Sequence, residues 1–287
     1  MPRDRQVEPE QLAERVWPGQ QVAIEPLGGG ITNRNFKVEA DGGTFVLRIG
    51  GKDTELLGID RSAEHAASSV AADLGLGPEV VAYVEPEGYL VTRYVDGEVG
   101  KVDVDRVGAA LRRLHHGPTF PGRFDSFRVV ETYRTTAREH GVGVPSAYEP
   151  AKELANQIER RRSRAPLRPC HNDLLNANFI DDGARLWLVD WEYAGMGDPF
   201  FDLGNFAVNH ELTEESERVL LSAYGSDDAE ALVLMRFMSD FREAMWGVVQ
   251  LAISELDFDF AAYVEEHFER LARTAADPRF LGALEAP

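Results

Sequence analysis

The residues best suited to chemistry lie in two short segments in the second half of the chain. The run 171–178 contains Asp173 and ends at Asn178, and Asp190 follows after a predicted β-hairpin. Phosphoryl transfer from ATP to a hydroxyl needs a carboxylate to orient the hydroxyl and accept its proton, and oxygen ligands that hold Mg²⁺ on the phosphates. We therefore expect Asp173 to be the catalytic base and Asn178 and Asp190 to be the metal ligands.

The hairpin between these segments is indicated by its own sequence pattern. Apolar runs at 179–180 and 186–189 flank the turn signal Asp181-Asp182-Gly183. Such a hairpin returns the chain and places Asp190 beside the loop that carries Asp173 and Asn178. The same order of Asp, Asn and Asp serves in protein kinases.

Both segments resemble those of a known group of enzymes. The run 171–178 is similar to the catalytic loop of the aminoglycoside phosphotransferase and choline kinase superfamily, and 190–205 resembles its metal-binding segment and the following helix. Within the superfamily the sequence most resembles bacterial choline and ethanolamine kinases, over about residues 24 to 270. The resemblance implies a small-molecule kinase that uses ATP and Mg²⁺. It also implies support roles: His171 would brace the loop by hydrogen bonding, and Asp202 would anchor its backbone.

A glycine-rich segment precedes the second predicted strand and could bind phosphates. Consecutive glycines let backbone N–H groups approach phosphate oxygens without obstruction by side chains. The Thr-Asn pair that follows resembles the phosphate loop of choline kinases, although a glycine run is also typical of a plain hairpin turn. The residues predicted to bind phosphates here are Gly28, Gly29, Gly30, Thr32 and Asn33.

Arg48 interrupts the apolar strand 45–49, where protein kinases place a phosphate-binding lysine. Its guanidinium can hold phosphate oxygens through two hydrogen bonds, and Glu64 on the next predicted helix could orient it. The alternatives are that Arg48 or Glu64 is simply exposed. By analogy of fold, the backbone around Thr92 and Tyr94 would form the hinge that binds adenine.

Acidic and aromatic residues near the metal ligand and in the last predicted helices could bind the acceptor. Aromatic faces with acidic residues nearby suit a quaternary ammonium group. The predicted acceptor-binding residues are Glu192, Tyr193, Glu243, Trp246, Phe258 and Tyr263. Core packing is the competing role for each aromatic residue. An amino sugar or aminoglycoside is the alternative acceptor, and a pseudokinase without turnover is a third possibility.

The pattern of predicted elements indicates an α+β, two-lobed, protein-kinase-like fold. Strand patterns dominate the first third after a short helix at 8–16, and a helix is expected at 60–74. Helices are also predicted at 103–115, 150–162 and from about 198 onward, and His115 and His116 are expected to cap the first of these. We divide the chain into an N-lobe (1–94) that binds the nucleotide and a C-lobe (95–287) that carries the catalytic, metal and acceptor sites.

Composition limits the partners. The formal net charge of -19 disfavours nucleic acid and anionic membranes and mildly favours cationic ligands. The alternative is that the acidity only keeps the protein soluble. The single cysteine, Cys170, lies in an apolar run and is predicted to be a buried thiol, and a chain without disulfides fits a reducing compartment. No signal peptide or membrane span is apparent, so we expect a cytoplasmic monomer or homodimer with a small cationic substrate.

Overall fold

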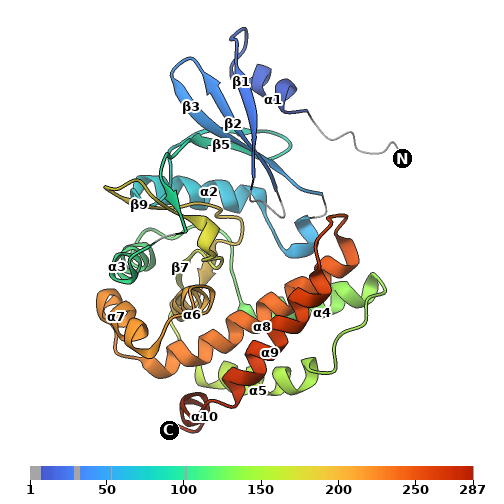
Figure 1. The fold of residues 1–287 in the computed structure, drawn as a ribbon, viewed down its shortest axis with the longest axis vertical. Helices are drawn as coiled ribbons and strands as arrows, with labels where there is room; N and C mark the ends of the chain where they lie inside the picture. The colour runs from blue at the N-terminus through green and yellow to red at the C-terminus, as the bar shows by residue number, and fades with distance from the viewer. Residues whose placement is uncertain (1–7, 29–32, 53, 101, 287) are drawn as a thin grey trace.

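The computed structural model describes residues 8–28, 33–52, 54–100 and 102–286, which form a sheet-rich part and a helix-rich part. Figure 1 shows the sheet at the top and most of the helices below it. The predicted α+β arrangement, with a β-rich first third, is therefore confirmed. The lobe boundary between residues 94 and 95 stays a prediction.

A five-stranded antiparallel sheet forms the first part, in the order β1-β2-β3-β5-β4. Its strands are β1 (Ala23–Leu27), β2 (Asn33–Ala40), β3 (Gly43–Gly50), β4 (Val80–Val84) and β5 (Tyr89–Arg93). The predicted turn between β2 and β3 has Gly42 and Gly43 at φ of 93° and 135°. Only glycine adopts such angles readily, so the Asp-Gly-Gly sequence determines this hairpin.

Alternating apolar residues of β2 and β3 face a small core beneath helix α1 (Pro9–Val16). Phe36 and Leu47 are buried in it, and Trp17 packs on Phe45 with ring centroids 5.1 Å apart. The short helix predicted at 8–16 is therefore confirmed, and it covers one face of the sheet.

Helix α2 (Arg61–Asp73) follows a short 3-10 turn, η1 (Thr54–Leu57), and lies between the sheet and the helix-rich part. The carboxylate of Asp60 accepts hydrogen bonds from the backbone N–H groups of Ser62 and Ala63, which caps the helix start. Ala67 and Ala71 are buried in the core of the helix-rich part. The first turn of α2 thus brings Glu64 to Arg48 of β3, while Ala67 and Ala71 on later turns pack on the helix-rich part.

The connection between the two parts passes very close to a later hairpin. After β5 the chain forms β6 (Glu98–Val99), which pairs with β8 (Phe179–Asp181), and β8 pairs with β9 (Leu186–Leu188). A Cβ atom on Gly97 would lie 2.5 Å from the carbonyl oxygen of Asp181. Glycine at this position therefore allows the connection to pack against the hairpin that leads to Asp190.

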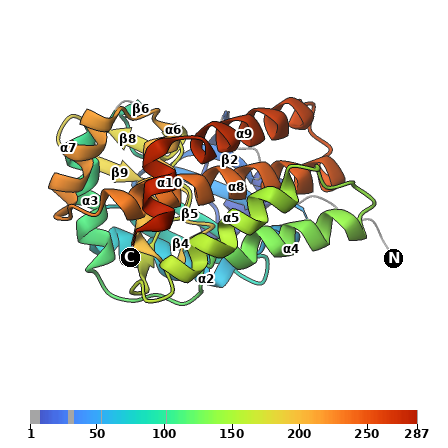
Figure 2. The same cartoon turned by 90° about the horizontal axis from the view of Figure 1, so that it is seen from below.

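The helix-rich part surrounds a single long helix. Its helices are α3 (Val104–His115), α4 (Ser126–Glu139), α5 (Tyr148–Arg161), α6 (Pro199–Asn209), α7 (Glu214–Tyr224), α8 (Ala229–Ile253), α9 (Phe260–Ala275) and α10 (Pro278–Glu285). Figure 2 shows α8 with α9 on one side and α4 on the other, and both pack against it. Among the helices described, even α8 lacks the uncharged apolar length that a membrane-spanning segment requires.

Helix α4 is absent from the sequence prediction. Its β-branched residues, including Val129, Val130, Thr132 and Thr135, lower intrinsic helix propensity because their side chains crowd the preceding turn. Packing against α8 supplies the missing stability, and Tyr133 on the packed face is only 1% exposed. Tertiary contacts therefore decide the structure of this segment.

Candidate active site

Strand pairing brings the two predicted catalytic segments together. β7 (Arg168–Cys170) leads into the loop 171–178 and pairs antiparallel with β10 (Gly195–Gly197), which follows the predicted metal segment. The backbone N–H of Val189 donates to the carbonyl of Asn178 at 3.0 Å. Asp190 therefore comes directly after a residue bonded to Asn178, as the predicted hairpin requires.

Asn178 is bonded to Asp173 in two ways. Its amide nitrogen donates to the Asp173 carbonyl at 2.8 Å and to the Asp173 Oδ2 atom at 3.2 Å. The short 3-10 turn η2 (Asn176–Asn178) brings the two side chains to this distance. Since the nitrogen is used in these bonds, the amide oxygen of Asn178 is the atom left to act as a metal ligand.

His171 is fully buried and braces the loop from within. Its Nε2 atom lies 3.0 Å from the Val189 carbonyl, and its Nδ1 accepts from the Asp173 backbone N–H at 3.3 Å. These partners require a neutral ring with the proton on Nε2. Burial lowers the pKa of His171, which favours the same neutral form. The geometry matches the supporting role implied by the family resemblance.

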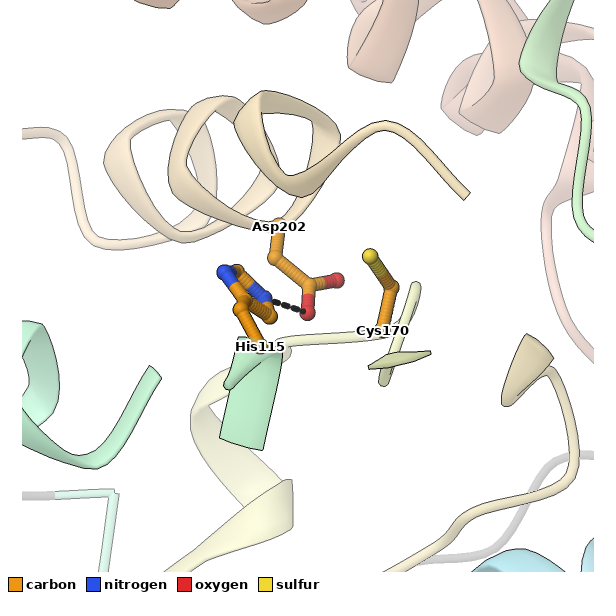
Figure 3. Close-up of side chains that lie close together, drawn as sticks. All are labelled: His115, Cys170 and Asp202. Atoms are coloured by element: carbon orange, nitrogen blue, oxygen red, sulfur yellow. Dashed lines mark hydrogen bonds and ion pairs between the residues drawn. The ribbon is translucent and has the colours of Figure 1, made fainter. Parts of the chain in front are cut away.

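Asp202, in the first turn of α6, holds the backbone at the start of the loop. Its two carboxylate oxygens accept from the N–H groups of His171 at 2.8 Å and Asn172 at 2.7 Å. Figure 3 shows His115 approaching the same carboxylate, with Nε2 3.0 Å from Oδ2. His115 Nδ1 in turn lies 2.9 Å from the Tyr224 hydroxyl. The carboxylate of Asp202 thus joins α3, α6 and the loop.

His115, Cys170 and Asp202 come within 4.8 Å of one another, yet they form an anchor and not a metal centre. Both oxygens of Asp202 are occupied by N–H donors. Burial raises the pKa of the Cys170 thiol well above its usual value, so the sulfur keeps its proton. The predicted buried thiol is confirmed, whereas the expectation that His115 caps α3 is wrong. His116 does so instead, with Nδ1 2.8 Å from the Arg112 carbonyl.

The carboxylate of Asp173 lies in a dry, charged environment. Asp173 is 6% exposed, and its Oδ1 accepts from Nη1 of Arg242 at 3.2 Å. Burial raises the pKa of Asp173, Arg242 opposes that rise, and the carboxylate of Glu243 adds to it. A carboxylate with a raised pKa is a better proton acceptor than an exposed aspartate, which suits a general base.

A cleft of about 320 Å³ separates the sheet from the helix-rich part beside these residues. Arg48, Asn178 and Asp190 are among the residues that line it. Amide and carboxylate oxygens facing one cleft are the donor set that Mg²⁺ prefers, so the residues fit the metal that the fold family implies. The rest of the wall is mainly apolar and suits the flat base of a nucleotide. It includes Leu27, Val46, Leu90, Val99, Ile180 and Val189.

Five charged residues, of which Arg48 and Asp190 line the cleft, are bonded to one another and are called here the Arg48 cluster: Arg48, Arg61, Glu64, Asp190 and Glu192. Arg48 is hydrogen-bonded to Asp190, forms an ion pair with Glu64 at 3.3 Å, and donates to Glu192 at 3.1 Å. Burial alone would lower the pKa of Arg48, but the three carboxylates raise it above its usual value. Arg48 is therefore firmly cationic, and Glu64 pairs with it as the sequence suggested.

Glu192 belongs to the Arg48 cluster, and its predicted acceptor role stays a prediction. We expected it on the acceptor side, but its carboxylate accepts from Arg48, from Arg61 at 3.3 Å and from the amide of Asn33 at 2.9 Å. The physical reason is competition, because two arginines of the sheet-rich part offer stronger partners than an aromatic wall. Arg61 was missed in the sequence. Its spacing of three residues from Glu64 on one helix, where Nη1 donates at 2.7 Å, was the available signal.

The predicted nucleotide-binding residues divide into those the structure describes and those it does not. Gly28, Thr92 and Tyr94 line the cleft. Asn33 is buried and bonded to Glu192 and to Arg61, whose Nη2 donates at 3.0 Å. The predictions for Gly29, Gly30 and Thr32 fall outside the described residues.

The aromatic residues predicted for the acceptor lie next to one another on the far side of Asp173. The indole N–H of Trp246 donates to the Tyr193 hydroxyl at 3.1 Å, and its ring packs edge-on against Tyr263 with centroids 5.7 Å apart. Phe258 lies 6.0 Å from Tyr263 and is 46% exposed. The Tyr263 hydroxyl donates to Glu243 at 2.9 Å. These side chains form one cluster, which the Tyr263–Glu243, Glu243–Arg242 and Arg242–Asp173 hydrogen bonds connect to the predicted base.

Arg242 links the acceptor side to the predicted catalytic base, Asp173. The sequence analysis did not single it out. It is 1% exposed and is hydrogen-bonded to both Asp173 and Glu243. Its guanidinium carbon lies 4.3 Å from the ring centroid of Tyr193, so it covers one face of that ring. A charged residue in the long helical pattern of α8 gives no sign of such burial, because only the tertiary structure encloses it.

Known proteins show similarity along most of the chain. Residues 23–238 match the phosphotransferase enzyme family, APH. LicA of Haemophilus influenzae is 29% identical over 207 residues, which cover 68% of this chain and 61% of LicA. The aligned region thus spans less than two thirds of the length of that relative.

Solved structures extend the similarity to the fold. A choline/ethanolamine kinase family protein from Mesorhizobium loti is 32% identical with a TM-score of 0.80, covering 93% of this chain and 92% of that one. Choline kinase LicA from Streptococcus pneumoniae is 25% identical with a TM-score of 0.80, covering 93% and 96%. The predicted resemblance to this branch of small-molecule phosphotransferases and the predicted kinase-like fold are both confirmed.

Proposed function

Because the chain belongs to the phosphotransferase enzyme family, we propose that it transfers the γ-phosphate of ATP to the hydroxyl of a small cationic amino alcohol. Choline and ethanolamine are the proposed acceptors. The observation that carries the proposal is the position of Asp173. Its Oδ2 accepts from Asn178, which lines the nucleotide cleft, and its Oδ1 accepts from Arg242 on the acceptor side.

The described residues suggest how the transfer would proceed. Asp173 orients the acceptor hydroxyl in line with the γ-phosphate and takes its proton, while Arg48 holds phosphate oxygens. Asn178 and Asp190 would hold Mg²⁺, which when bound neutralises charge on the phosphates. The backbone between Thr92 and Tyr94 would bind the base, and the glycine-rich segment that begins at Gly28 would approach the phosphates.

The cationic acceptor is supported by charge and by aromatic surface. The protein carries a formal net charge of -19, which attracts cations over long range. Trp246, Tyr263 and the half-exposed Phe258 offer ring faces near Glu243. Cation–π attraction at such faces contributes roughly 0.5 to 2 kcal/mol. The single cysteine is compatible with the reducing cytoplasm, which also supplies ATP, and we propose that compartment.

ADP release in the presence of Mg-ATP tests the proposal with a panel of choline, ethanolamine, several amino sugars and one aminoglycoside. Turnover above the ATPase background with choline or ethanolamine, lost in Asp173→Ala, is the expected result. Turnover with an amino sugar or aminoglycoside alone would replace the acceptor while keeping the phosphotransferase. ATP binding without turnover on any acceptor would support a pseudokinase and contradict the proposal.

A further inference from the structure

Arg242 is a buried cation in the middle of α8. Stability alone does not explain why an arginine stands at this position. Its Nε and Nη2 atoms are buried and have no hydrogen-bond partner among the described residues. Each unsatisfied buried donor costs roughly 1 to 3 kcal/mol, and a buried ion pair is often no more stabilising than apolar residues of similar volume. An arginine kept under these conditions indicates a role in function.

The bonds of Arg242 cancel charge at one defined place. Nη1 donates both to Asp173 Oδ1, at 3.2 Å, and to Glu243 Oε1. The other oxygen of Glu243 accepts from the Tyr263 hydroxyl. Glu243 is therefore already matched by a cation and by a hydroxyl donor. With Asp173 and Glu243 ionised, the three charged groups sum to a single negative charge.

The polar groups of the aromatic wall are likewise engaged with one another. The Tyr193 hydroxyl accepts from Trp246, and the Tyr263 hydroxyl donates to Glu243. One face of the Tyr193 ring is covered by Arg242. What this wall still offers to a ligand is mainly ring surface, on the half-exposed Phe258 and the partly exposed Tyr263.

Ring surface and spare hydrogen-bond acceptors select different cations. A primary ammonium has three N–H donors, and each needs an acceptor when the group leaves water. A quaternary ammonium has none and is held by aromatic faces and by net charge. A site with one uncompensated negative charge, in which each oxygen of Glu243 already accepts one hydrogen bond, suits the second kind of cation.

We propose that Arg242 is a specificity-determining residue that pairs with Glu243 and thereby makes the acceptor site prefer a cation whose nitrogen carries no hydrogen over a primary ammonium. The inference rests on the proposed function, since it concerns the acceptor of that reaction. It assigns to Arg242 a second effect as well, because the same Nη1 atom positions the carboxylate of Asp173.

The first test uses the wild-type protein with four acceptors that differ only in N-methylation: ethanolamine, its monomethyl and dimethyl derivatives, and choline. We expect kcat/KM to rise with methylation and to be at least about tenfold higher for choline than for ethanolamine, since tenfold corresponds to about 1.4 kcal/mol. Equal values, or a preference for ethanolamine, would overturn the inference. Because no variant is needed, this test does not depend on how a substitution folds.

Substitutions then test whether Arg242 and Glu243 set the preference. In Arg242→Met the choline-to-ethanolamine ratio should fall toward one, because Glu243 becomes free to accept from an ammonium N–H. In Glu243→Gln both acceptors should lose a similar factor and keep their ratio, since the site loses charge but no ammonium partner. A Glu243→Gln variant that loses ethanolamine activity selectively would show that Glu243 binds the ammonium directly, against the inference.

Arg270→Met is the matched control. Arg270 on α9 forms an ion pair at 2.5 Å with Asp240, which like Arg242 is on α8. Arg270 has no bond to Asp173 or Glu243 among those the structure describes. Its removal should leave the ratio unchanged, and a shift equal to that of Arg242→Met would mean that any lost pair on α8 alters selectivity. Failure of the proposed function is distinguishable, because it would appear as no turnover with any member of the methylation series.

Discussion

Asp202 makes a quantitative prediction possible because each of its bonds is known. In Asp202→Asn the retained carbonyl oxygen can still accept from the Asn172 N–H, and His115 can change tautomer to meet the new amide. In the wild type the backbone N–H of His171 lies 2.8 Å from Oδ2. In the variant this N–H faces the new amide NH2 group, which is also a donor. One orphaned buried N–H corresponds to about 1 to 3 kcal/mol of lost unfolding free energy.

The loop that Asp202 holds also carries Asp173, so activity should fall with stability. A displacement of about 1 Å in a positioning group can lower a rate by about a hundredfold. We therefore expect kcat at saturating ATP and choline to fall about 10- to 100-fold. Urea unfolding gives the free-energy change from the shift in midpoint, with the denaturant slope unchanged if the two-state description holds.

Asp240→Asn separates the two effects of Asp202→Asn. Asp240 is also a buried carboxylate, and its Oδ1 lies 3.2 Å from Nδ1 of His267 and 2.5 Å from Nη2 of Arg270, both on α9. The Asp240→Asn variant should lose unfolding free energy but keep the kcat of the wild type. The reasoning about Asp202 would be refuted if its Asn variant unfolds within about 0.5 kcal/mol of wild type, or if both variants lose the same fraction of kcat.

Three further substitutions test the remaining parts of the site. Asp173→Ala should lower kcat about 10² to 10⁴-fold with ATP affinity little changed, and normal turnover would remove Asp173 as the base. Asp190→Ala should weaken Mg-ATP binding, so a metal titration curve identical to wild type would contradict its role as a ligand. Gly97→Ala should lower the melting temperature and weaken nucleotide binding, because its Cβ would lie 2.5 Å from the Asp181 carbonyl oxygen. An unchanged melting curve, with and without ATP, would show that the connection can shift without cost.

The parts of the site that the sequence could predict are those whose geometry is local. Asp173 and Asn178 lie five positions apart in one loop, and a hairpin with a clear turn signal leads to Asp190. Short-range geometry of this kind is nearly independent of the rest of the fold. The same holds for α2, which begins at the cap formed by Asp60 and so carries Glu64 to Arg48.

The parts that the sequence could not predict depend on distant segments. Glu192 and Tyr193 are adjacent, yet one is bonded to arginines of the sheet-rich part and the other to Trp246 of α8. Neighbouring residues outside regular structure can point to opposite sides, and no periodicity reveals which. Arg242 shows the same limit, because its burial arises only where α8 passes beneath the catalytic loop.

The charged groups on the two sides of Asp173 differ, so ATP and the acceptor would need different counterions. The Arg48 cluster contains two arginines and three carboxylates, so its formal charge is negative. Under the proposed function, a divalent cation would be the counterion that lets a triphosphate bind there. On the other side Arg242 balances one of the two carboxylates, Asp173 and Glu243, so this group of residues is at most singly negative and a monovalent cation would balance it. Buried ion pairs add little stability by themselves. Under the proposed function, their arrangement would bring a metal-bound anion and an organic cation together at the carboxylate of Asp173.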